Sequence, residues 1–163
     1  MESNEPNRSC RKLLIVDDSP EMRGLLRRLL SETFAEIREC ADGDQAIAAF
    51  DDQRPDYVLM DIAMPGRDGL SATACILARN PAARIFIVSQ HDAAPFHAAA
   101  AQAGAYGFVS KTDLQPLREY FRLEQFRTGA PSSDGAGARE GTSPPINNGK
   151  PRANDCNTQP GKL

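Results

Sequence analysis

The chain has little of what marks several large functional classes. It has no tryptophan, only 6% aromatic residues and a net charge of −3 over 163 residues, which gives no sign of the basic surface that nucleic acid binding needs. No apolar run approaches the roughly 20 residues of a membrane-spanning helix. The polar, acidic start of the chain does not resemble a secretory signal. We therefore expect no direct nucleic acid partner and no membrane partner.

Cysteine and histidine are also scarce. The four cysteines have neither metal nor redox spacing, and His91 and His97 have no Cys or His partner at ligand spacing. Cys40 and Cys75 lie in apolar segments, which favours burial of both thiols. A chain without a disulfide pattern fits a reducing, cytoplasmic location.

Short apolar runs alternate with helical patterns from residue 12 to about residue 127. The runs are rich in Val and Ile, which is typical of strands buried on both faces of a parallel sheet. Strands are expected at 12–17, 36–40, 57–61, 85–89 and 106–110, and helices at 19–31, 44–52, 70–78, 94–102 and 113–126. Five such units predict an α/β fold: a flavodoxin-like, doubly wound, five-stranded parallel sheet in the order 2-1-3-4-5 with five helices.

The helical patterns also predict which side chains face the core. Leu25 belongs to the apolar set of helix 19–31, and Leu123 is an apolar anchor of helix 113–126. Arg23, with two further arginines of the same helix, is expected on the solvated face.

The composition changes sharply after residue 127. Residues 128–163 hold 6 Gly and 5 Pro, a composition typical of disorder and unlike that of a second domain. We therefore predict a disordered leader over 1–10, one folded domain over 11–127 and a disordered Gly/Pro-rich tail over 128–163.

Polar side chains stand at the ends of four of the expected strands. Asp17 and Asp18 follow the first strand, Asp61 ends the third, Ser89 ends the fourth and Lys111 follows the fifth. In open sheets of this kind, ligands bind beyond the carboxyl ends of the strands. Three carboxylates there suit a hard dication such as Mg²⁺. A hydroxyl and an ammonium beside them suit a phosphoryl group.

These segments resemble the response-regulator receiver domain of two-component signalling, the CheY-like family. The resemblance covers residues 11–127 and rests on four motifs in order, at 14–19, 60–69, 87–89 and 104–111. It implies that Asp61 is the phosphoacceptor. The phosphoryl group would come from a phosphohistidine on a sensor histidine kinase or a phosphotransfer protein.

The resemblance also implies a metal site. Asp17 and Asp18 match the acidic pair that holds Mg²⁺, with Asp18 as the direct ligand. Asp61 and the backbone carbonyl of Ala63 match the remaining protein ligands.

Further positions match groups that respond to phosphorylation. Ser89 matches the hydroxyl that moves toward the phosphoryl group, and Lys111 the lysine that pairs with it. Phe108 matches an aromatic switch residue, although a plain core aromatic is an open alternative. Thr112 departs from the family, whose lysine is often followed by proline.

The leading interpretation is a single-domain response regulator whose phosphorylation switches a protein-interaction surface toward an unknown output protein; a homodimer is compatible with it. It would not be an enzyme beyond its own phosphorylation and dephosphorylation. The alternative is a truncated or degenerate transcriptional regulator, which acts by dimerisation or titration without binding DNA. Residues 110–113 resemble the receivers of helix-turn-helix regulators, but no basic helix pair follows residue 126. A phosphatase is disfavoured because such enzymes usually place Asp-x-Asp after the first strand.

Overall fold

The computed structural model describes residues 11–127, so the predicted leader and tail lie outside the described residues. The strands are β1 (Lys12–Val16), β2 (Glu36–Cys40), β3 (Tyr57–Met60), β4 (Ile85–Ser89) and β5 (Gly107–Ser110). The helices are α1 (Pro20–Leu30), α2 (Gly43–Gln53), α3 (Gly69–Arg79), α4 (Ala94–Ala103) and α5 (Gln115–Arg127). The predicted alternation is confirmed. No helix within this range is both long and apolar enough to cross a membrane.

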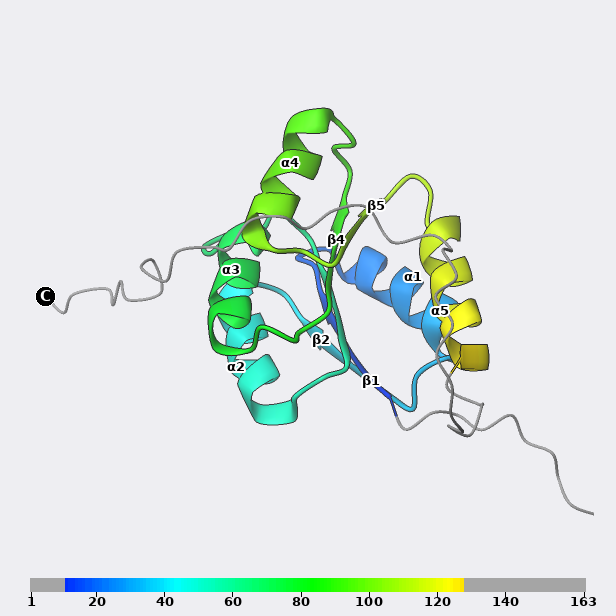
Figure 1. Cartoon of the computed structure of the whole chain (residues 1–163). Helices are drawn as coiled ribbons and strands as arrows, with labels where there is room; N and C mark the ends of the chain where they lie inside the picture. The colour runs from blue at the N-terminus through cyan, green and yellow to red at the C-terminus, as the bar shows by residue number, and fades with distance from the viewer. Residues whose placement is uncertain (1–10, 128–163) are drawn as a thin grey trace, which may run out of the picture.

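All strand pairs of the sheet are parallel, and their order is β2-β1-β3-β4-β5, as predicted. Helices α1 and α5 cover one face, whereas α2, α3 and α4 cover the other (Figure 1). Strands β1 and β3 are neighbours, and Val16 pairs with Met60. The backbone N–H of Asp61 then donates to the carbonyl of Val16 at 2.9 Å. The topology therefore places the acidic ends of β1 and β3 side by side.

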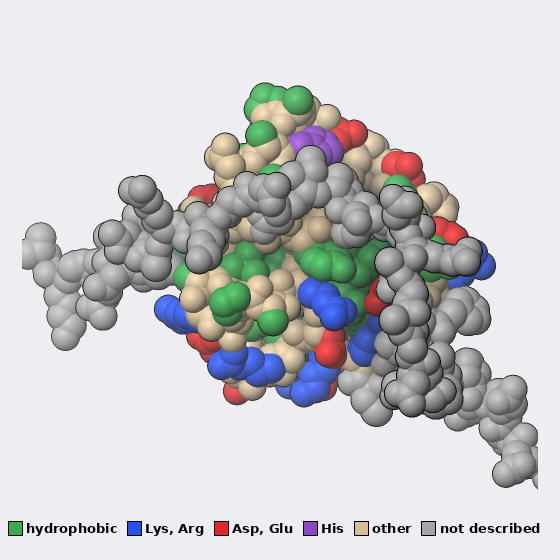
Figure 2. Space-filling model, in the orientation of Figure 1, with side chains coloured by type: hydrophobic (Ala, Val, Ile, Leu, Met, Phe, Trp, Pro, Cys, Tyr) green, Lys and Arg blue, Asp and Glu red, His purple; other side chains and the backbone are tan. Residues whose placement is uncertain are grey.

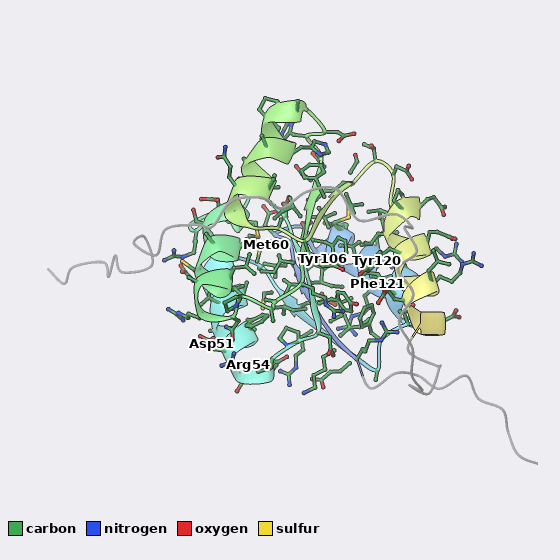
Figure 3. All side chains as sticks on the ribbon, in the orientation of Figure 1. Asp51, Arg54, Met60, Tyr106, Tyr120 and Phe121 are labelled. Atoms are coloured by element: carbon green, nitrogen blue, oxygen red, sulfur yellow. The ribbon has the colours of Figure 1, made fainter. Side chains whose placement is uncertain are left out.

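The two faces of the sheet are packed differently. The core under α2, α3 and α4 is mainly aliphatic and includes Cys40. Cys40 and Cys75 are both buried, as predicted. The core under α1 and α5 contains a cluster of aromatic rings among its aliphatic side chains, and the ring of Phe121 lies edge-on to Tyr57 with centroids 4.9 Å apart. Figure 3 shows Phe121 and Tyr120 reaching from α5 toward the sheet. Such edge-to-face contacts add to the stability that burial provides.

Two leucines expected in the core are exposed instead. Leu25 is 41% exposed and Leu123 is 52% exposed. The reason is the narrow inward stripe of each helix: successive residues lie about 100° apart at 3.6 residues per turn, and only one stripe reaches the sheet. Leu26 fills that stripe in α1, and Phe121 fills it in α5, two residues before Leu123.

The helix ends fix the loops around the sheet. The Ser19 hydroxyl accepts from the backbone N–H of Met22 at 3.3 Å, which caps α1. Helix α4 ends at Gly104 with a φ of 88°. Helix α2 ends at Arg54 with a φ of 47°, and Arg54 is the one non-glycine residue with positive φ in the described range. Left-handed backbone at a non-glycine residue costs roughly 1–2 kcal/mol.

Candidate functional site

Lys111 joins the acidic ends of two strands. Its Nζ lies 2.7 Å from Oδ2 of Asp17 and 3.0 Å from Oδ2 of Asp61. All three groups are withdrawn from solvent: Asp17 is 1% exposed, Asp61 is 4% exposed, and the Lys111 side chain is 7% exposed. The backbone N–H of Lys111 also donates to the carbonyl of Ser89 at 2.8 Å, which anchors the end of β5 to β4. The carboxyl end of the sheet thus holds a buried ion triad.

A third carboxylate completes an oxygen-rich corner. Carboxylate oxygens of Asp17, Asp18 and Asp61 all lie within 4.8 Å of one another, and Asp18 is exposed where the other two are buried. Oδ1 of Asp17 accepts from the backbone N–H of Ser19 at 2.9 Å, which fixes the carboxylate plane. Hard carboxylate oxygens are the ligands that Mg²⁺ prefers. The donor set therefore fits Mg²⁺.

Burial and charge act in opposite directions on the triad. Burial raises the pKa of Asp61, and the hydrogen bond and charge of Lys111 only partly offset that rise. Burial lowers the pKa of Lys111, but its hydrogen bonds to Asp17 and Asp61 outweigh this and leave the pKa raised. Lys111 therefore stays an ammonium at neutral pH. One ammonium faces two buried carboxylates, and the excess negative charge attracts a cation.

Three further residues were expected at the site. Ser89 is 2% exposed at the end of β4, and its Oγ accepts from the backbone N–H of His91 at 3.1 Å. Phe108 is half-buried on β5, and its ring centroid lies 3.9 Å from the ring of His97 on α4. Ala63 is exposed in the loop after Asp61.

Two residues at the site were not identified from the sequence. Arg23 was expected on the solvated face, which is wrong: its side chain is only 18% exposed, and its Nη1 donates to the carbonyl of Asp17 at 2.7 Å. Gly69 entered the sequence analysis only as the last residue of the 60–69 motif, with no role of its own. A Cβ at Gly69 would collide with the carbonyl oxygen of Asp61, so no larger residue fits there without moving the site. A glycine eight residues after Asp61 is the one sequence signal that pointed to this close approach.

Comparisons with known proteins agree with this geometry. The model of the response regulator receiver domain matches residues 13–122. The chain is 37% identical over 107 residues to the chemotaxis protein CheY of Halobacterium salinarum, which covers 66% of this chain and 89% of that protein. It is 33% identical over 122 residues to the response regulator GacA of Pseudomonas aeruginosa, which covers 71% of this chain but only 57% of GacA.

Solved structures give the same result. A LuxR-family two-component response regulator from Aurantimonas sp. has a TM-score of 0.64 at 33% identity and covers 74% of this chain and 87% of that one. The CheX–CheY–BeF3–Mg complex from Borrelia burgdorferi has a TM-score of 0.62 at 28% identity and covers 72% of this chain and 87% of that one. The chain belongs to the response-regulator receiver domain family and is a CheY-like receiver of two-component signalling.

Proposed function

We propose that the chain is a phosphorylation switch in which Asp61 accepts a phosphoryl group from the phosphohistidine of a sensor histidine kinase or a phosphotransfer protein. The observation that carries this proposal is the buried ion triad, in which Lys111 lies 3.0 Å from Asp61 and 2.7 Å from Asp17. Phosphoryl transfer to a carboxylate needs the nucleophile, a fixed positive charge and a cation site within one small volume. The switch would act in the cytoplasm, because a chain without a disulfide pattern fits a reducing compartment.

The transfer itself requires positioning more than covalent help. A carboxylate oxygen of Asp61 attacks phosphorus, the N–P bond of the donor breaks, and its electron pair returns to the imidazole. Because Oδ2 of Asp61 is paired with Lys111, we expect Oδ1 to be the attacking oxygen. Lys111 then neutralises charge on the phosphoryl oxygens. Mg²⁺ held by Asp17, Asp18, Asp61 and the carbonyl of Ala63 would offset the charge of the same oxygens.

The response would begin at Ser89. Its hydroxyl accepts from the backbone N–H of His91, and a phosphoryl group on Asp61 offers new acceptor oxygens to which the hydroxyl can donate. A shift of Ser89 would pull the loop that leads into α4. Phe108 lies against His97 of that helix, so its ring has a direct contact through which the shift could reach the surface. This differential contact is what biases a two-state surface.

The output is proposed to be a protein contact. The Borrelia burgdorferi structure is a complex of CheX, CheY, BeF3 and Mg²⁺, which supports an output protein of some kind for this chain. A second candidate is suggested by the similarity to GacA and to the LuxR-family regulator. In it, the chain would be a truncated or degenerate relative that dimerises with, or titrates, longer partners. A homodimer of this chain is compatible with both candidates, so the test uses a longer partner: light scattering of the phosphorylated chain mixed with a full-length GacA-like regulator should show a mixed dimer only for the second.

Intact-mass spectrometry after incubation with acetyl phosphate and Mg²⁺ tests the switch. We expect the wild-type protein to gain one phosphoryl group, with acetate as the leaving group. Asp61→Asn should gain none, and EDTA should abolish the gain in the wild type. A folded wild-type protein that binds Mg²⁺ and gains no mass would overturn the proposal.

A further inference from the structure

A cavity of about 520 Å³ lies at the amino end of the sheet, at the edge opposite Asp61. Its walls come from the turn between α2 and β3, the turn between α3 and β4, the start of β1 and helix α5. Its charged lining residues are Arg11, Arg54, Arg84, Asp56 and Glu124. This volume is in the range of pockets that hold small organic molecules. The phosphorylation proposal makes no use of the cavity.

The lining carries excess positive charge. Two of its arginines donate to neutral groups: Arg84 Nη1 to the hydroxyl of Tyr57 at 2.7 Å, and Arg54 Nη1 to Oδ1 of Asn80. The carboxylate of Asp56 accepts from the backbone N–H of Lys12 at 2.7 Å. The lining as a whole includes three arginines and two acidic residues. Figure 2 shows Lys and Arg side chains on the lower part of the visible face, with Asp and Glu side chains between them.

Arg54 supplies a second, independent observation. It ends α2 with a φ of 47°, a conformation for which glycine or asparagine is the cheaper choice. Figure 3 shows Arg54 at the end of α2. Its guanidinium reaches across to Asn80 at the end of α3, beside the cavity. Strained backbone of this kind persists where the side chain or the loop has a use.

We propose that this cavity binds a small organic anion whose phosphate or carboxylate group is held by the guanidiniums of Arg54 and Arg84. Guanidiniums bind both groups through paired N–H donors. The rest of the ligand would lie against the apolar walls formed by Pro55, Ala82 and Ala83. Bound there, it would tie the turn before β3 to the turn before β4.

Titration of the full-length chain with pyrophosphate and with citrate, at constant ionic strength, tests the proposal by NMR of the arginine Nε–H signals. We expect saturable shifts of the Arg54 and Arg84 signals with at least one probe. Arg54→Gly should weaken binding at least about tenfold. The melting temperature of this variant should not fall, because glycine suits the left-handed position. Arg84→Gln should weaken binding as well.

Arg38→Gln is the matched control, because Arg38 pairs with Glu36 on β2, its side chain is 58% exposed, and it does not line the cavity. Binding should be unchanged in this variant. A response to pyrophosphate alone assigns the site to phosphate groups, and a response to citrate alone assigns it to carboxylates. The proposal is overturned if the wild type shows no saturable shift at about 10 mM probe. It is also overturned if Arg54→Gly binds as well as the wild type, or if Arg38→Gln loses as much affinity.

Discussion

Lys111 at the carboxyl end of the sheet and Lys12 at its amino end both pair with carboxylates, yet their surroundings differ completely. Lys111 Nζ lies 2.7 and 3.0 Å from the carboxylates of Asp17 and Asp61, and none of these three side chains is more than 7% exposed. Lys12 Nζ lies 3.9 Å from Glu36, and the two side chains are 44% and 43% exposed. The Lys111 group is buried with short N–O distances, whereas the Lys12–Glu36 pair is solvent-exposed with a long one.

The two ion-pair groups have different consequences for stability and for chemistry. A surface pair such as Lys12 with Glu36 contributes little to stability, because water and salt screen it. Burying charges is costly, and such a cluster is rarely the most stable solution for a core. The triad around Asp61 carries that cost while leaving negative charge in excess. We infer that the carboxyl end is built for a cation and a phosphoryl group, and the following predictions test this contrast.

Loss of the buried Lys111 ammonium should have the largest effect on stability. Lys111→Met leaves Asp17 and Asp61 buried without the ammonium, so the free energy of unfolding in EDTA should fall by about 3 kcal/mol. Lys12→Met is the control at the other end, and its loss should stay below about 1 kcal/mol. Urea denaturation measures both. Equal losses would show that the two ends do not differ as described.

The metal should produce the next largest effect. Mg²⁺ at about 30 times its dissociation constant should stabilise the wild-type protein by about 2 kcal/mol. Asp18→Asn should remove most of that gain and leave stability in EDTA nearly unchanged, because Asp18 is exposed. Thermal unfolding with and without Mg²⁺ tests this. An undiminished gain in Asp18→Asn would remove Asp18 from the ligand set.

A smaller effect is expected at the amino end. Tyr57 is 1% exposed, and its hydroxyl accepts from Arg84 at 2.7 Å. Tyr57→Phe removes this hydrogen bond and should cost about 1 kcal/mol in urea denaturation. Phosphorylation by acetyl phosphate should be unchanged, because the hydroxyl is far along the strand from Asp61. A loss of phosphorylation would mean that the two ends are coupled.

The smallest effect concerns pH. Burial raises the pKa of Asp61 in the folded protein above its unfolded value. The neutral acid is therefore favoured by folding, and this contribution to stability is present at acid pH and is lost as the pH rises through the folded pKa. In EDTA, the wild type should lose more stability over that pH range than Asp61→Asn does. Identical pH profiles would contradict the assignment of a raised pKa to Asp61.

Much of this contrast could be predicted from the sequence, because it depends on strand order. The apolar strands that end in Asp17 and Asp61 become neighbours once the order 2-1-3-4-5 is assumed. Lys111 comes directly after the fifth strand, so it is expected at the same edge of the sheet. The exposure of Leu25 and the partial burial of Arg23 could not be predicted. The periodicity of a helix shows which residues share a face, but it does not show how much of that face the neighbouring elements bury. The positive φ of Arg54 could not be predicted either, because left-handed helix ends usually hold Gly or Asn rather than Arg.

The most direct test locates the phosphoryl group within the chain. Protein treated with acetyl phosphate and Mg²⁺ is reduced with borohydride, which converts an aspartyl phosphate into homoserine and releases phosphate. Peptide sequencing by tandem mass spectrometry then identifies the altered residue. We predict homoserine at position 61, dependent on Mg²⁺ and with Asp17 and Asp18 intact. Homoserine at either of those positions, or at none, would contradict the assignment of Asp61 as the phosphoacceptor.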